Sequence, residues 1–123
     1  MKNIKILIVD DNDKDIKLLH DYLLSQECIV VIAKNEADVF KQLQEQNLDL
    51  VIMDIVMSDM SGWRICDKIK RDPLFKHIPV LMCSASIKED DDFSKYETGD
   101  GYIQKPINFN RLVTAIQKLL IKN

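Results

Sequence analysis

The sequence predicts an α/β fold of three layers, in which a doubly wound, five-stranded parallel sheet lies between two layers of helices. Short runs rich in Ile and Val alternate five times with amphipathic stretches of ten or more residues. Each strand-helix unit takes about 25 residues, a length that favours parallel strands joined by right-handed helical crossovers. The chain has 123 residues, 46% of them apolar, which suffices for one sizeable core and is too short for two. We therefore expect a single domain over residues 1–123.

The first half of the chain contains two strand-helix units and a third strand. We expect strands where apolar residues cluster, at residues 4–9, 28–33 and 49–55. The first helix, over residues 14–25, has Asp13 as its expected N-cap. Its apolar face follows offsets of three and four and consists of Ile16, Leu19 and Leu23. Asn35 is expected to cap the second helix. The side chains of this helix that are expected to face the core are Val39, Phe40 and Leu43.

The second half contains three further helices and two strands. One helix begins near Gly62 and ends at Asp72, because a residue that precedes proline disfavours the helical conformation. Strands are expected at residues 79–85 and 101–105. Between these strands, Ser86 and Glu89 have the form of a capping box for a helix with few apolar contacts. Asn108 is expected to cap the last helix, which has the clearest apolar stripe, Phe109, Leu112, Val113, Ile116 and Leu119.

Charge and composition exclude several classes of protein. The chain has 17 Lys and Arg against 20 Asp and Glu, a formal net charge of −3. Its densest basic cluster is only Lys68, Lys70, Arg71 and Lys76. Binding to nucleic acid through phosphate neutralisation needs a concentrated positive patch. We therefore expect no direct contact with nucleic acid.

The apolar runs and the cysteines indicate the compartment. The longest apolar runs are a few residues, far below the roughly 18 of a membrane span. The run at residues 6–9 is interrupted at once by Asp10, so it does not form a signal peptide. Three cysteines at wide spacing, each within an apolar segment, suggest neither disulfides nor zinc but small buried hydrophobes, Cys28, Cys66 and Cys83. We expect a cytoplasmic protein without membrane contact.

Polar side chains follow four of the five predicted strands. They are Asp10, Asp11, Asp54, Ser84 and Lys105. In an open parallel sheet, ligands bind outside the carboxyl ends of the strands. Three carboxylates gathered there repel one another, unless a proton or a cation holds them together. Magnesium suits such a site because it binds one or two carboxylates and shares its other positions with water and phosphate oxygens.

The same residue set supplies the parts of phosphoryl transfer. A carboxylate can attack phosphorus to form an aspartyl phosphate. The reaction needs mainly positioning and neutralisation of charge. Lys105 would pair with an oxygen of the transferred phosphate, beside the metal.

At these residues the chain resembles the receiver domain of response regulators, the family of the bacterial chemotaxis regulator. The likeness covers essentially all 123 residues. It depends on four segments in the family's order, namely Ile-Val-Asp-Asp at 8–11, Met-Asp-Ile-Val-Met at 53–57 followed by Gly62, Ser-Ala at 84–85, and Tyr-Ile-Gln-Lys-Pro at 102–106. The resemblance implies the flavodoxin-like receiver fold with strand order 2-1-3-4-5.

The resemblance also implies a role for each site residue. Asp54 would be the phosphoacceptor, and Lys105 would contact the phosphoryl group. Asp10 and Asp11 would hold Mg²⁺ together with Asp54 and the main-chain carbonyl of Val56. Two further residues would act as the switch that responds to phosphorylation, Ser84 and Tyr102. In the family a proline usually follows the residue at Met57; here Ser58 stands there, so we expect a looser loop.

We interpret the chain as a single-domain response regulator in a two-component phosphorelay. Its phosphodonor would be a phosphohistidine on a sensor histidine kinase or a histidine phosphotransfer protein. Its signal would pass onward by phosphotransfer, or by contact of a downstream protein with the surface of the helix after Ser86, the fifth strand and the last helix. We expect a monomer or weak dimer, no output domain after residue 123, and no turnover of external substrates.

Two other classes of function remain open at this point. An interaction module with the receiver fold would bind partners constitutively, and a lack of Mg²⁺ binding would favour it. A small hydrolase, such as a phosphatase with an aspartyl phosphate intermediate, would need a cap over its substrate. The chain is short for such a cap.

Overall fold

The centre of the molecule is a sheet of five parallel strands in the order β2-β1-β3-β4-β5. This computed structural model describes residues 1–85 and 99–121. The strands are β1 (Lys5–Val9), β2 (Ile29–Ala33), β3 (Leu50–Asp54), β4 (Val80–Ser84) and β5 (Gly101–Gln104). The predicted three-layer fold and strand order are confirmed.

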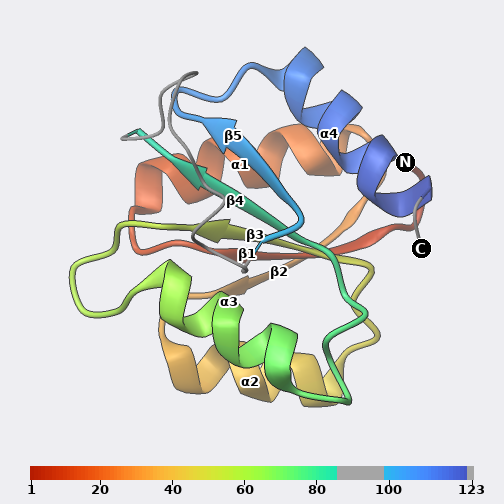
Figure 1. Cartoon of the computed structure of the whole chain (residues 1–123). Helices are drawn as coiled ribbons and strands as arrows, with labels where there is room; N and C mark the ends of the chain where they lie inside the picture. Colours follow the sequence, from red (N-terminus) through yellow and green to blue (C-terminus); the bar gives the residue numbers. More distant parts are fainter. Residues whose placement is uncertain (86–98, 122–123) are drawn as a thin grey trace.

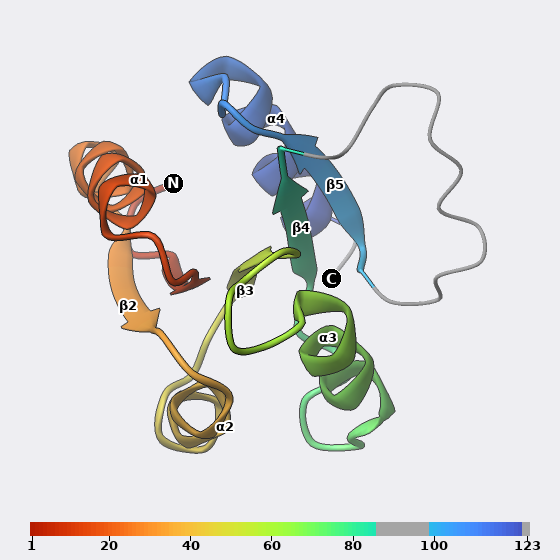
Figure 2. The same ribbon diagram turned by 90° about the vertical axis from the view of Figure 1, so that its left-hand side faces the viewer.

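Helices cover both faces of the sheet (Figure 1). The view along the layers shows helices on both sides of the strands (Figure 2). On one face lie α1 (Asp13–Ser25) and α4 (Phe109–Ile121), and on the other lie α2 (Glu36–Glu45) and α3 (Gly62–Arg71). This arrangement buries every residue of β3 and β4, as expected for parallel strands that are covered twice.

The core consists of two apolar clusters, separated by the sheet. Because successive side chains of a strand point to opposite faces, Leu7 and Val9 pack with α2 and α3, whereas Ile6 and Ile8 pack with α1 and α4. The three cysteines are buried free thiols, as predicted. The same alternation determines the face on which each polar side chain emerges at the strand ends.

The predicted strands agree with the observed ones to within one residue at each end. The predicted N-cap of the first helix is wrong, because Asn12 and not Asp13 occupies that position. The Asn12 side chain accepts a hydrogen bond from the amide of Asp15 at 3.0 Å. Asn35 caps α2 in the same way, as predicted. The helix expected after Ser86 lies outside the described residues.

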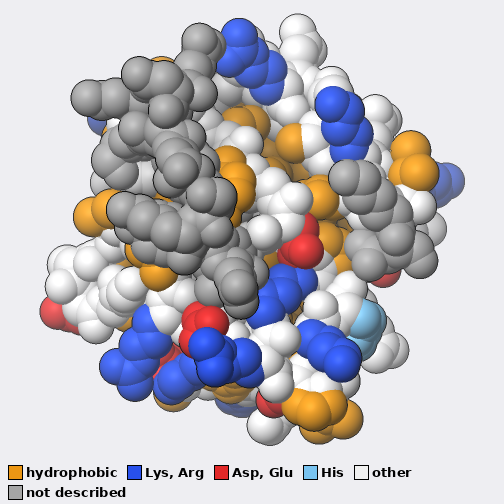
Figure 3. All heavy atoms as spheres, in the orientation of Figure 1, with side chains coloured by type: hydrophobic (Ala, Val, Ile, Leu, Met, Phe, Trp, Pro, Cys, Tyr) orange, Lys and Arg blue, Asp and Glu red, His pale blue; other side chains and the backbone are white. Residues whose placement is uncertain are grey.

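Basic side chains gather on the face shown in Figure 3, over the region of α2 and α3. Three of them are paired with acids: Lys68 with Glu36, Lys70 with Asp100 and Arg71 with Asp67. Their charge is therefore partly compensated. Among the described helices, none has the length and apolar character that a membrane span requires.

Candidate functional site

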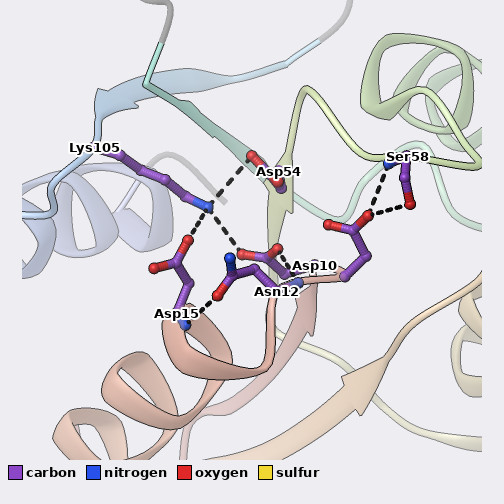
Figure 4. Close-up of polar contacts among 7 residues, drawn as sticks. Asp10, Asn12, Asp15, Asp54, Ser58 and Lys105 are labelled. Atoms are coloured by element: carbon purple, nitrogen blue, oxygen red, sulfur yellow. Dashed lines mark hydrogen bonds and ion pairs between the residues drawn. The ribbon is translucent and has the colours of Figure 1, made fainter.

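Three predicted site residues meet at the carboxyl edge of the sheet (Figure 4). Asp10 directly follows β1, Asp54 is the last residue of β3, and Lys105 directly follows β5. Alternation places the side chains of Asp10 and Asp54 on the face of Ile8 and Ile52, toward α1 and α4. Both carboxylates are buried, with 4% and 6% of each residue exposed.

The ammonium group of Lys105 links these carboxylates. Its Nζ donates hydrogen bonds to Asp10 Oδ2 at 3.0 Å and to Asp15 Oδ2 at 3.1 Å. It lies 3.5 Å from Asp54 Oδ1. Asp15 was missed in the sequence, because an acidic residue in the first turn of a helix is already explained by the helix dipole. Lys105 therefore joins three acidic residues from two strand ends and one helix.

Burial and mutual repulsion govern the charge of this cluster. Burial, and then the negative charge of Asp10, raise the pKa of Asp54 to about 6, although Lys105 opposes the increase. Burial works against the charged form of Lys105, yet the hydrogen bond to Asp10 raises the pKa of Lys105 above its ordinary value. The ammonium of Lys105 thus stays charged at neutral pH. The Asp54 carboxyl loses its proton about one pH unit below neutrality.

Asp11 lies in a different environment, on the exposed side of the cluster. Its Oδ2 accepts two hydrogen bonds from Ser58, from the amide at 2.7 Å and from the hydroxyl at 2.8 Å. These bonds lower the pKa of Asp11 below its usual value. From the sequence we expect a looser loop at Ser58, where the family usually has proline. That expectation does not include the contact with Asp11, which ties the loop after β3 to the loop after β1.

The three carboxylates form a group that fits a divalent cation. One oxygen each from Asp10, Asp11 and Asp54 lies within 4.8 Å of the others. Three carboxylate oxygens this close together could hold one divalent cation. The donor set consists of hard carboxylate oxygens, the class of ligand that magnesium prefers. Val56 lies in the loop directly after β3, two residues after Asp54, and an isolated bridge joins it to Ser61.

Ser84 and Tyr102 belong to the other face of the sheet. Ser84 ends β4 and is 2% exposed, and its carbonyl accepts a hydrogen bond from the amide of Lys105 at 3.1 Å. The alternation from Met82 directs its side chain toward the α2 and α3 face. Tyr102 packs on the same face, its ring centroid 6.0 Å from that of Trp63 in α3, at an interplanar angle of 47°.

Gly62 holds the loop after β3 close to Asp54. Its amide donates to the carbonyl of Ile55 at 3.0 Å. A Cβ atom built at this position would lie 2.0 Å from the carbonyl oxygen of Asp54. Only glycine permits this approach of two backbones, which explains the Gly62 of the sequence pattern.

The comparisons with known proteins agree with this geometry. The family model described as the response regulator receiver domain matches residues 6–117. The chain belongs to this family. Receiver domains are signalling proteins of two-component systems that interact with histidine kinases and downstream targets.

Curated relatives match nearly the whole chain. The polar-differentiation response regulator DivK of Brucella anthropi is 28% identical over 116 residues, which are 94% of each protein. The probable transcriptional regulator ycf29 of Pyropia yezoensis is 29% identical over 120 residues. That match covers 97% of this chain and 54% of the relative, so this chain spans about half the length of that protein.

Solved structures share the fold. A putative response regulator from Chloroflexus aurantiacus superimposes with a TM-score of 0.88 at 26% identity, covering 98% of this chain and 99% of the other. The receiver domain of a sensor histidine kinase from Pseudomonas aeruginosa has a TM-score of 0.84 at 18% identity, covering 96% and 98%. That structure contains a magnesium ion coordinated in its active-site cleft.

Proposed function

We propose that residues 1–123 form a single receiver domain that accepts a phosphoryl group on Asp54 from a phosphohistidine donor. The donor would belong to a sensor histidine kinase or a histidine phosphotransfer protein. The observation that carries the proposal is the position of Asp54, a buried carboxylate 3.5 Å from the Lys105 ammonium and grouped with Asp10 and Asp11. A buried carboxylate is costly unless a charge partner or a bound cation compensates it, and Lys105 and the acidic cluster offer both.

The transfer step forms one bond and breaks another. A carboxylate oxygen of Asp54 bonds to phosphorus as the bond between phosphorus and the donor histidine nitrogen breaks, and the nitrogen keeps the electron pair. Lys105 offsets the negative charge that the phosphoryl group brings into the site. Because the pKa of Asp54 is about 6, most of the carboxyl is in the ionised, nucleophilic form at neutral pH.

Mg²⁺ is the proposed cofactor of this reaction. Asp10, Asp11, Asp54 and the main-chain carbonyl of Val56 would hold it, and its charge would neutralise phosphoryl oxygens. The grouping of the three carboxylates supports this assignment. So does the magnesium ion in the cleft of the Pseudomonas aeruginosa receiver domain, which has the same fold.

The proposed switch connects the phosphoryl group to the surface near β5. Ser84 ends β4 at the same carboxyl edge as Asp54. Its side chain would turn from the α2 and α3 side so that the hydroxyl donates to a phosphoryl oxygen, and Tyr102 would change its rotamer. The Tyr102 ring lies next to that of Trp63, so a rotation of the tyrosine side chain would change this contact. A downstream protein would read the change on the surface that includes β5 and α4, and onward phosphotransfer is the other output of the same chemistry.

Mass spectrometry of the intact protein tests the phosphoacceptor. The chain is incubated with acetyl phosphate, with and without Mg²⁺, and compared with the variants Asp54→Asn and Asp59→Asn. We expect one acid-labile phosphoryl group on the unsubstituted chain and on Asp59→Asn, only when Mg²⁺ is present. Asp54→Asn should remain unmodified. Asp59 is a matched control because it is an exposed aspartate in the loop after β3.

A negative result would favour the interaction module. If the unsubstituted chain takes up no phosphoryl group from acetyl phosphate or from a phosphorylated histidine kinase domain, the proposal fails. If Asp54→Asn is still modified, another residue is the phosphoacceptor.

A further inference from the structure

Ser58 makes a contact to the acidic cluster that the proposed function does not use. Its amide nitrogen and its hydroxyl both donate to Oδ2 of Asp11, at 2.7 and 2.8 Å. The two residues are 47 positions apart, so the contact joins the loop after β3 to the loop after β1 (Figure 4). Two donors that converge on one oxygen confine a carboxylate more tightly than a single hydrogen bond does.

The loop that carries Ser58 is itself fixed. The neighbouring Met57 is 8% exposed and belongs to the core cluster under α2 and α3. Val56 forms an isolated bridge to Ser61, which is the N-cap of α3. Ser58 therefore projects its two donors from a backbone that is anchored on both sides. Asp11 is exposed, so packing does little to orient its side chain, and the contact to Ser58 supplies the orientation.

We propose that Ser58 is a positioning residue of the Mg²⁺ site, which holds the Asp11 carboxylate in the orientation that binds the metal. This inference rests on the magnesium part of the proposed function. Carboxylates that bind metals are themselves hydrogen-bonded by outer groups, and loss of such a group typically costs 10- to 100-fold in metal affinity. The hydroxyl also ties Asp11 to the loop that carries Val56, so two proposed ligands move as one unit.

Calorimetric titration of the full chain with MgCl₂ tests the role of Ser58. We compare the unsubstituted chain with Ser58→Ala, Ser58→Thr and Ser61→Ala. Ser58→Ala keeps the amide donor and loses the hydroxyl, so we expect about tenfold weaker Mg²⁺ binding, the lower end of the range for an outer group. Ser58→Thr retains a hydroxyl and should restore affinity to within about twofold of the unsubstituted chain.

Ser61→Ala is the matched control. It removes a hydroxyl from the same loop, but that hydroxyl accepts from the amide of Arg64 at 3.4 Å and caps α3. Loss of this cap should lower the melting temperature without metal. The bridge between Ser61 and Val56 is a main-chain contact that alanine retains, so Mg²⁺ affinity should stay unchanged. Ser58→Ala should weaken Mg²⁺ binding and leave the melting temperature without metal unchanged. A purely structural role for Ser58 would lower the melting temperature alone.

The outcomes separate this inference from the proposed function. Equal Mg²⁺ affinity of Ser58→Ala and the unsubstituted chain would overturn the role of Ser58 and leave the proposed function intact. Weaker binding that Ser58→Thr does not restore would also overturn it. If the unsubstituted chain binds no Mg²⁺, both the magnesium site and the inference fail.

Discussion

Asp54 and Asp11 belong to one acidic cluster, yet their pKa values move in opposite directions. Asp54 is buried beside Asp10, and burial is the main cause of its raised pKa, about 6. Asp11 is exposed and accepts two hydrogen bonds from Ser58, which lower its pKa. The cluster therefore has a buried half around Asp54, in which the environment disfavours the ionised carboxylate, and an exposed half around Asp11, in which hydrogen bonds stabilise it.

The two halves also differ in what surrounds them. In the buried half, Lys105 closes a network between two strand ends and α1. The exposed half opens into a hollow of the surface whose lining includes Asp11, Ser58, Lys34 and Arg64. The buried half thus resembles a preorganised reaction centre, and the exposed half is accessible to ions from solvent. Four variants test whether the two halves differ in this way.

Gly62→Ala should have the largest effect, because it pushes apart the backbones that place Asp54. The new Cβ would lie 2.0 Å from a main-chain oxygen that cannot move aside like a side chain. We expect a loss of about 4 kcal/mol or more in the free energy of unfolding, measured in urea. Gly101→Ala is the control, since its nearest atom is Cδ1 of the flexible Leu81 at 3.2 Å. Equal losses would contradict the role assigned to Gly62.

Lys105→Met should destabilise the buried half by leaving its carboxylates without their shared cation. Removing one partner of a buried ion pair costs about 3 kcal/mol or more. The pKa of Asp54 should rise further, because Lys105 lowers it in the unsubstituted chain. Carbon NMR of the carboxyl would follow this change. Lys34→Met, which breaks an exposed pair with Asp13, should cost less than about 0.5 kcal/mol.

Asp54→Asn should stabilise the protein at neutral pH in the absence of metal. Because the pKa of Asp54 is raised from 3.8 to about 6 on folding, its ionisation costs folding free energy that grows between these two pH values, is constant above about pH 6 and is small at pH 4. The variant should gain about 2 kcal/mol at pH 7.5. Urea unfolding between pH 4 and pH 8 would measure the gain. A gain that does not fade toward pH 4 would contradict the electrostatic explanation.

Asp11→Asn should have the smallest effect, with the opposite sign. A lowered pKa means that ionised Asp11 favours the folded state at neutral pH, and the contribution is lost as the pH falls through the pKa of the folded protein. Because Asp11 is exposed, solvent screening limits the loss to below about 0.5 kcal/mol at pH 7.5. The same urea series applies, and a stabilised Asp11→Asn variant would show that the two halves do not differ.

Much of the fold and part of the site follow from local sequence patterns. The Ile- and Val-rich runs marked five strands, because a strand covered on both faces needs apolar residues throughout. Polar residues just past these runs marked the carboxyl edge, where Asp10, Asp54 and Lys105 do meet. Their common face follows from the alternation of side chains along a strand. The roles proposed for them follow from the resemblance to the receiver family.

Other contacts depend on how distant segments pack, and local periodicity carries no signal for them. Asp15 bonds to Lys105 across 90 positions, and Ser58 bonds to Asp11 across 47. Even the N-cap of α1, Asn12 rather than Asp13, was decided by backbone geometry at the strand end. The layers, the strands and the edge at which the acids gather can be predicted from the amino-acid sequence, because they depend on burial patterns that repeat along the chain. The donor that each carboxylate receives is visible only in the folded chain, because hydrogen bonds depend on distances and angles that arise when separate loops meet.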